Sequence, residues 1–526
     1  MKLTRRELLG VTATAAATSC SSHLAKRSSA NSDYDVLVVG GGSAGAVVAA
    51  RLSENPNRRV MLLEAGGEAK DPLIDQPLQW FRLLGSELVF PDETSQQRYV
   101  GAKTLFAGHG RVLGGSSAIN AMIHHRPMPL DINDWGIDGW RWEDLEPMLR
   151  LSETFLGDRQ EGRGTAGPIG VSLIPDPPPL ADAALAAADR LGLGATTDIN
   201  TGTQLGAAIN QLAFAQGRRQ HTGLAYLTTA RGRDNLTIRT NAQVDSLSIE
   251  GDRVTGLSYR HRGEKRLAGG AHVVLCSGAL RTPQLLMLSG LGPADMLRKH
   301  GIHVVVDAPE VGANLHDHLL ISGNNFATPE PIEASGTHGS VAVVYASSTP
   351  NGPRDLLLNV STNANVIPPL TGAAAGFKSS FSFMRPRSRG QLSLTSNDPT
   401  IQPAIDVNYL ADERDREGML NALSLSRELL SAREFSQFGG VEQNGDYFRD
   451  AASSLKFLHD GATPFGHYCG TCRMGTDKNA PVASSLAFRG ISGLSVVDAS
   501  VIPAIPSCPT NPLVVAIAEL FAQRFG

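Results

Sequence analysis

The sequence predicts an α/β protein in which a Rossmann-like nucleotide-binding domain is interrupted by a second, sheet-containing domain. Three observations support this prediction. An apolar run at 36–39 precedes a glycine turn and a helix, and a similar run at 272–275 is followed by Ser277 and Gly278. A third run, 494–497, leads through a proline-rich loop to a helix over 513–525. Parallel strands buried on both faces are apolar throughout, so the three runs are assigned to one sheet.

The glycine turn has the spacing of a dinucleotide-binding motif, G-x-G-x-x-G. Gly40 permits the tight turn, Gly42 lets the backbone approach a pyrophosphate, and Gly45 lets the helix pack on the strand. The helix that begins at Ser43 directs its N-terminal N–H groups at the phosphates. Glu64 follows the next strand, where an acid can bind a ribose 2′-hydroxyl. This favours FAD or NAD over NADP; the alternative is a glycine turn in a sheet that binds no ligand.

The remaining elements divide the chain between the two domains. Helices are predicted over 181–191 and 412–432, and strands over 236–239, 244–249 and 390–395. A chain of 526 residues exceeds one ordinary hydrophobic core. We expect a discontinuous nucleotide-binding domain and a substrate-binding domain. The first covers 33–155, 230–318 and 460–526, and the second covers 156–229 and 319–459.

Composition and charge argue against several kinds of partner. The formal net charge is −4, and no basic patch of the kind that nucleic acid requires is present. No apolar run is long enough to span a bilayer. The pairs His124–His125 and His316–His318 lack the third and fourth ligands that a metal site needs, so no metal is expected.

Residues 1–30 resemble an export signal rather than part of the fold. Arg5 and Arg6 form a twin-arginine pattern that precedes a mildly apolar stretch of small residues. Twin-arginine export carries folded proteins, which suits a chain that takes up its cofactor in the cytoplasm. The expected location is the periplasm or outside the cell. Cys20 offers an alternative, a lipid anchor, although the leucine usual three positions earlier is absent.

Two of the five cysteines form a C-x-x-C pair, Cys469 and Cys472. A thioredoxin-like redox site needs a small redox fold around this motif, which the sequence does not supply. We therefore expect structural thiols, with oxidation after export as an option.

Four further motifs carry a resemblance to a known family. They occupy residues 110–122, 277–292, 467–475 and 497–503 and occur in the same order as in the glucose–methanol–choline (GMC) oxidoreductase family. The sequence most resembles the choline dehydrogenase-like and aryl-alcohol oxidase-like branch, from about Asp33 to the C-terminus. The resemblance implies FAD as cofactor, with its isoalloxazine ring between the nucleotide-binding domain and the substrate domain.

The resemblance also assigns cofactor contacts. Glu64 would hold the adenosine ribose, the Val244 backbone would meet the adenine, and Asp498 and Ala499 would contact the ribityl-pyrophosphate region. Ile119 stands where some members attach FAD through a histidine, so non-covalent FAD is expected. The full set of expected cofactor-binding residues is Gly40, Gly42, Ser43, Gly45, Glu64, Gly115, Ser116, Asn120, Val244, Asp498, Ala499, Asn511 and Pro512.

The same resemblance places His467 against the flavin, with Asn511 at the family's second His-or-Asn position. Oxidation of an alcohol needs a base for the hydroxyl proton, and neutral imidazole suits that task. The amide of Asn511 can hydrogen-bond the alcohol oxygen. We expect an alcohol CH–OH group to be oxidised to a carbonyl, with hydride passing to flavin N5 and electrons then to oxygen, a quinone or another carrier. Two alternatives stay open, a hydroxynitrile lyase-like FAD protein and a non-catalytic flavoprotein. The sequence identifies neither the alcohol nor the oligomeric state.

Overall fold

The computed structural model describes residues 33–158, 160–201, 205–333, 339–362 and 375–525. The predicted export signal, residues 1–30, and the candidate lipid-anchor residue Cys20 lie outside these ranges. Within the described part of the chain, no helix is long and apolar enough to cross a membrane.

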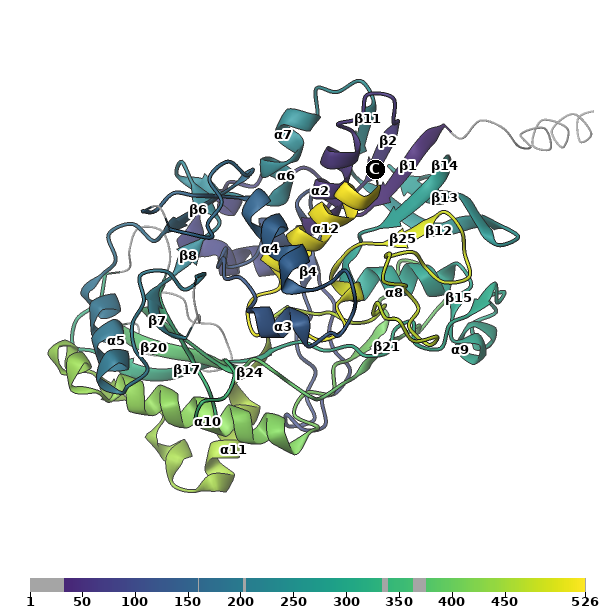
Figure 1. Cartoon of the computed structure of the whole chain (residues 1–526). Coiled ribbons are helices and arrows are strands. Elements are labelled where there is room, and N and C mark those ends of the chain that lie inside the picture. The colour runs from purple at the N-terminus through teal and green to yellow at the C-terminus, as the bar shows by residue number, and fades with distance from the viewer. Residues whose placement is uncertain (1–32, 159, 202–204, 334–338, 363–374, 526) are drawn as a thin grey trace, which may run out of the picture.

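The first sheet contains the strands of the glycine motif (Figure 1). Strand β1 pairs in parallel with β2 on one side and β14 on the other, and β11 and β25 extend this parallel part, whereas β12 and β13 are antiparallel. In spatial order the strands are β11 (Leu236–Arg239), β2 (Val60–Leu63), β1 (Tyr34–Val39), β14 (Glu264–Leu275), β13 (Arg253–His261) and β12 (Ala242–Glu250), with β25 (Leu494–Val496) paired to β14.

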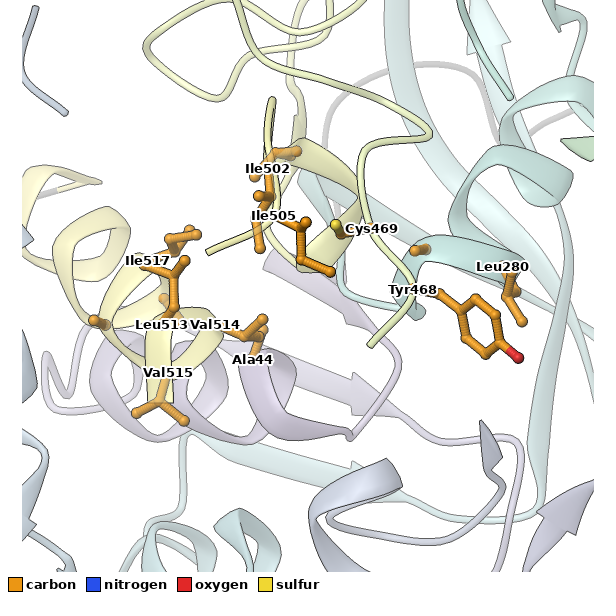
Figure 2. Close-up of a cluster of buried hydrophobic side chains, with 14 of the residues drawn as sticks. Ala44, Leu280, Tyr468, Cys469, Ile502, Ile505, Leu513, Val514, Val515 and Ile517 are labelled. Carbon is orange, nitrogen blue, oxygen red and sulfur yellow. The ribbon is translucent and has the colours of Figure 1, made fainter. Parts of the chain in front are cut away.

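Two helices far apart in sequence pack together beside this sheet. Helix α2 (Ser43–Leu52) begins at the glycine turn, and α12 (Asn511–Phe525) lies against it. Both are apolar on nearly every side, as helices buried between other elements are. Figure 2 shows Leu513 and Val514 of α12 beside Ala44 of α2. This contact brings the C-terminal helix to the glycine turn.

The second sheet is mainly antiparallel and forms the lower-left part of Figure 1. Helix α10 (Glu413–Leu430) runs along it and contacts β17, β19 and β20. The strand order is β23 (Val441–Glu442), β17 (Leu319–Ala327), β20 (Gly376–Phe383), β19 (Leu356–Thr362), β18 (Ser340–Ala346) and β7 (Gly206–Ile209), with β24 (Ala462–Pro464) also paired to β17.

Shorter elements connect the sheets. The remaining α-helices are α3 (Pro129–Asn133), α4 (Trp142–Leu151), α5 (Pro179–Arg190), α6 (Thr222–Ala225), α7 (Leu227–Ala230), α8 (Gly278–Leu288), α9 (Ala294–Lys299) and α11 (Ala451–Gly461). The 3-10 helices are η1 (Pro72–Asp75), η2 (Pro77–Gly85), η3 (Gly115–Ala118), η4 (Arg433–Phe438), η5 (Gly445–Phe448) and η6 (Ala499–Val501). The remaining strands are β3 (Val89–Phe90), β4 (His109–Gly110), β5 (Glu153–Phe155), β6 (Ile169–Leu173), β8 (Gln211–Leu212), β9 (Phe214–Ala215), β10 (Arg218–Arg219), β15 (Leu291–Gly292), β16 (Val306–Asp307), β21 (Gln391–Ser393) and β22 (Ala404–Asp406).

The predicted fold class is confirmed, because the three apolar runs are β1, β14 and β25 of one parallel arrangement. The domain limits stay a prediction. Strand β24 lies within the range expected for the nucleotide-binding domain, yet it pairs with β17 of the second sheet. Helix α5 begins two residues earlier than expected, since Pro179 suits the first turn of a helix, where its missing N–H costs nothing.

Cys469 and Cys472 are fully buried free thiols, as are the other described cysteines, Cys276 and Cys508. The option that the C-x-x-C pair is oxidised is therefore not realised in this structure.

Candidate active site

A cavity of about 900 Å³ is lined by residues of both sheets. Most of the catalytic and cofactor-binding residues predicted from the sequence line this cavity, although they come from opposite ends of the chain. Those lining it are Gly40, Gly42, Ser43, Glu64, Gly115, Ser116, Asn120, Val244, His467, Asp498, Ala499 and Asn511. Gly45 and Pro512 do not line it, because both are buried in helix contacts behind its wall.

The glycine turn is shaped by two close backbone approaches. Gly40 has φ +97°, and a Cβ there would lie 2.5 Å from the carbonyl oxygen of Cys276. A Cβ at Gly45 would lie 1.8 Å from the carbonyl oxygen of Gly40. Neither distance is sterically allowed, so only glycine lets α2 start directly at the end of β1.

A second glycine loop meets this turn at the cavity. A Cβ at Gly115 would lie 2.6 Å from the Cα of Gly42, whereas a Cβ at Gly42 would meet only the Cα of Gly115, at 3.7 Å. The space beside Gly42 is thus open toward the cavity, and the first turn of α2 faces the same edge. Such an edge fits a pyrophosphate group, which backbone N–H groups and the helix dipole can bind.

Glu64 is held rigidly beside this edge. Its Oε2 accepts from Gly41 N and its Oε1 from Gly66 N, both at 2.8 Å. Burial raises the pKa of the carboxyl to about 7, and the main-chain bonds oppose that rise. Each oxygen retains a lone pair that can accept from a ribose hydroxyl. Val244, on β12, lines the same cavity.

Asp498 follows β25 and fixes the start of α8. One carboxylate oxygen accepts from Gly278 N and Thr282 Oγ1, at 2.9 and 2.6 Å, and the other accepts from Ser500 N at 2.8 Å. The side chain therefore holds the loop that presents Ala499 to the cavity.

The loop of Ser116 and Asn120 is anchored by a buried arginine, Arg219. Its Nη1 donates to the carbonyl oxygen and the side-chain Oδ1 of Asn120, at 2.6 and 2.8 Å, and its Nε donates to Ile74 O at 2.9 Å. The side chain is fully buried, and burial lowers the pKa of the guanidinium to about 9. Arg219 was not among the predicted site residues.

Asn511 is oriented by the glycine turn. Ser43 Oγ donates to Asn511 Oδ1 at 2.7 Å, so the amide oxygen is engaged. Its Nδ2 group is left as a donor at the cavity wall.

His467 is held at its main chain by Asp317. The Asp317 carboxylate accepts from His467 N at 2.6 Å and from Gly466 N at 3.3 Å. The hydroxyl of Tyr409 also donates to it, at 2.5 Å. Burial raises the pKa of Asp317 to about 7, and these donated bonds act in the opposite direction.

A second histidine, His318, determines which nitrogen of His467 carries the proton. His318 Nε2 lies 3.0 Å from the carbonyl oxygen of Met384, which can only accept, so Nε2 carries the hydrogen. Burial lowers the pKa of His318 to about 3, and the ring is neutral. Its Nδ1 must then accept the 2.9 Å hydrogen bond from His467 Nδ1–H.

It follows that Nε2 of His467 has no proton. Burial and the neighbouring His318 lower the pKa of His467 well below its usual value, so this ring is neutral as well. Phe465 stacks on it, with ring centroids 4.3 Å apart. The cavity is therefore lined by an imidazole that is ready to accept a proton.

The pattern His316-Asp317-His318 is the sequence signal for these two residues, although the sequence interpretation weighs it only as a metal site. Within the described residues, no three His, Cys, Asp or Glu side chains converge as metal ligands. His316 Nε2 instead accepts from Ile505 N, and its Nδ1 donates to Asn314 O.

Comparisons with known proteins agree with this geometry. Sequence models of the N- and C-terminal parts of the GMC oxidoreductases match residues 34–320 and 386–518. The chain is 34% identical to pyridoxine 4-oxidase of Microbacterium luteolum, over 94% of this chain and 99% of that protein. It is 33% identical to an oxygen-dependent choline dehydrogenase of Klebsiella pneumoniae, over 93% and 95% of the two chains.

A solved structure is also similar. The crystal structure of pyridoxine 4-oxidase from Mesorbium loti superposes with a TM-score of 0.90 at 35% identity, covering 94% of this chain and 99% of that one.

Replacing Arg219 with methionine should destabilise the loop of Asn120. Buried carbonyl oxygens of Ile74 and Asn120 would lose their donor, so we expect the free energy of unfolding to fall by about 3 kcal/mol. The measurement is denaturant unfolding followed by circular dichroism. The matched control is Arg218→Met, which removes a half-exposed ion pair to Asp75 and should cost less than about 1 kcal/mol. Equal losses in the two variants would contradict the anchoring role of Arg219.

Proposed function

The chain belongs to the GMC oxidoreductase family, and on that premise we propose that His467 is the base that removes the hydroxyl proton of the substrate. The enzyme is an FAD-dependent oxidoreductase that acts on alcohol CH–OH groups. The observation that supports His467 most directly is the chain of contacts from Met384 O through His318 to His467. It leaves Nε2 of His467 unprotonated, and His467 lines the same cavity as the glycine turn.

Asn511 would steady the alcohol oxygen as it loses its proton. Its Oδ1 is occupied by Ser43, so Nδ2 is the group available to donate to an alkoxide that develops during the reaction. A primary amide does not compete for the proton, because it is not basic at neutral pH. In this proposal His467 removes the proton, and Asn511 stabilises the negative charge that develops on the alcohol oxygen.

The glycine edge, Glu64 and the anchored loop of Asn120 are the residues that would hold FAD. When bound, FAD supplies the hydride acceptor. We propose that it is bound without a covalent link at Ile119, since an alkyl side chain has no atom able to form one. Ile119 is instead 3% exposed and packs with Val112 and Ala118.

Dioxygen is the acceptor that we propose for the electrons. Support comes from the names of the similar proteins, one an oxidase and the other an oxygen-dependent dehydrogenase. A quinone would be the alternative for an exported enzyme.

We also propose that residues 1–30 direct export through the twin-arginine route, on the strength of Arg5 and Arg6 before a stretch of small residues. A Rossmann-type cofactor bound before export requires a route that accepts folded proteins.

Replacing His467 with alanine should slow the anaerobic bleaching of FAD by a primary alcohol about 10²- to 10⁴-fold, the usual contribution of a general base. Stopped-flow absorbance provides the rate, and the visible spectrum shows that FAD is retained. The surface variant His303→Ala is the control and should react as the wild type does. Bleaching at wild-type rate in His467→Ala would rule out His467 as the base. An unbleached wild-type flavin in the presence of converted substrate would indicate lyase chemistry.

His318 should act as a positioning residue through the tautomer of His467. His318→Phe removes the acceptor for His467 Nδ1–H and should lower the limiting bleaching rate about 10- to 100-fold with little change in KM. His318→Gln supplies an amide oxygen as acceptor and should recover part of the loss. In the wild type the rate should stay constant from pH 8 down to below about pH 6, because the base has a lowered pKa. An inflection near pH 6.5, or no rescue by glutamine, would contradict this role.

Changing Arg5 and Arg6 together to lysine should block export. The full-length protein, expressed in a bacterium with a twin-arginine system, should then remain in the cytoplasmic fraction with FAD bound. The unchanged protein should appear, shortened at its N-terminus, outside the cytoplasm, as fractionation and mass spectrometry would detect. Identical fractionation of the two proteins would refute the export proposal.

A further inference from the structure

A second cavity, of about 550 Å³, shares no lining residue with the one that contains His467. Its volume is in the range of small-molecule binding sites. It is bounded by the β18–β19 loop, the loop after β20, the N-terminal half of α10, and Ala504 and Ile505. We call this cavity the arginine groove, after four of the side chains that line it: Arg385, Arg387, Arg389 and Arg414.

Three of these arginines come from one loop with a simple pattern, Arg385-Pro-Arg-Ser-Arg389. The loop follows β20 and forms neither helix nor strand at these positions. Pro386 favours an extended backbone for itself and for Arg385. Side chains two residues apart in an extended chain point to the same side. The alternation therefore directs Arg385, Arg387 and Arg389 into one groove, and all three line it.

The loop is attached to the start of α10, which carries the fourth arginine. Asp415, in the first turn of α10 and 2% exposed, accepts from Arg387 N and Ser388 N, both at 2.8 Å. Asp412 caps the helix by accepting from Arg414 N at 2.9 Å, and its own N–H donates to Ser388 Oγ at 3.0 Å. The main chains that carry Arg387 and Arg414 are thus fixed relative to each other.

Two of the four guanidinium groups are already engaged. Arg385 forms ion pairs with Asp131 and Asp134, at 3.0 and 2.5 Å. Arg389 donates through Nε to Asn314 Oδ1, and through Nη1 to the carbonyl oxygens of residues 386 and 388. Its Nη2 donates to no residue that the structure describes.

The other two guanidinium groups, those of Arg387 and Arg414, have no such partners. Across the described ranges of the chain, neither side chain forms an ion pair or a hydrogen bond, and both residues are exposed. Burial lowers the pKa of Arg389; the positive charge of Arg387 acts in the same direction, and Asp415 opposes it. Like charges therefore lie close together in the groove, an arrangement that a bound anion would stabilise.

The described carboxylates that line the groove are Asp355 and Glu417. Asp355 accepts from Ser348 N at 2.7 Å and from Ser348 Oγ at 2.5 Å, so both of its oxygens are engaged. Glu417 is exposed and lies three residues after Arg414, yet no ion pair joins these two side chains. The carboxylates of the groove thus leave Arg387 and Arg414 available to a ligand.

We propose that the arginine groove binds a small soluble anion that carries two or more phosphate or carboxylate groups. A guanidinium group donates in a planar fork that matches the paired oxygens of either group. Two arginines from separate elements, with Nη2 of Arg389, provide donors for more than one such group. The groove is separate from the cavity of His467, so this site goes beyond the proposed function and does not depend on it.

The test is calorimetric titration of the full-length, FAD-loaded protein at low salt with pyrophosphate and with citrate. FAD occupies the glycine edge in this form, so pyrophosphate cannot bind there. The wild type should bind at least one of the two anions with a Kd of about 1 mM or tighter. The anion that binds more tightly identifies the preferred group, phosphate or carboxylate.

The double variant Arg387→Gln/Arg414→Gln should weaken that binding about tenfold or more, because it removes two charged donors. Both side chains are exposed and have no described partner, so the free energy of unfolding should stay close to that of the wild type. Glu417→Gln removes the free carboxylate of the groove and should tighten binding about two- to fivefold.

A matched control separates a defined site from general attraction to positive charge. Arg298→Gln/Lys299→Gln removes two exposed positive charges from α9, outside the lining of the groove. This variant should bind the anion as the wild type does. Vesicles of phosphatidylglycerol are tested in parallel by sedimentation, since a lipid headgroup could supply the same phosphate chemistry.

Four results would overturn the site. They are no binding of either anion by the wild type, unchanged affinity in Arg387→Gln/Arg414→Gln, equal weakening in the α9 variant, and binding to vesicles alone. None of these measurements involves alcohol oxidation, so the failure of one proposal would leave the other standing.

Discussion

The segment from Gly466 to Met474 joins the two halves of the molecule through its main chain, and the site depends on that junction. On one side, Asp317 holds the N–H groups of residues 466 and 467, and Cys469 exchanges two hydrogen bonds with His316. On the other side, residues 470, 472 and 474 donate to the carbonyl oxygens of 499–501. The imidazole of His467 is therefore fixed relative to both the substrate sheet and the glycine edge. The proposed role of His467 as a base requires such fixation, because a general base must lie within hydrogen-bond reach of the proton that it removes.

Burial gives the pair of histidines its chemical character. In water an imidazole is often protonated near pH 6, whereas two rings in contact in a poorly solvated site cannot both carry charge. The pKa values of His318 and His467 are both lowered here, and the carbonyl of Met384 determines where the proton lies between the two rings. The uncharged carbonyl of Met384 thus determines, through His318, which nitrogen of His467 carries the proton.

The sequence could predict those parts of the site whose geometry depends mainly on residues close together in the chain. The turn of Gly40 to Gly45 is determined by backbone clashes within a few residues and with one neighbouring strand, so its spacing alone is informative. His318 and Arg219 acquire their roles from partners 149 and 99 residues away. Neither the hydrophobic periodicity of the sequence nor the spacing of its motifs indicates such long-range contacts.

The contact between α2 and α12 has a kinetic consequence. Ser43 and Asn511 are 468 residues apart, as are Arg51 and Glu519, which pair between the same two helices. Contacts between residues so distant in sequence form slowly, since a long loop must close before they are made. During synthesis α2 is made long before α12, so the contacts of Ser43 with Asn511 and of Arg51 with Glu519 cannot form until α12 has been made. The part of the cavity formed by Ser43 and Asn511 is therefore completed only after α12 has been synthesised, and until then the face of α2 that packs on α12 lacks this cover.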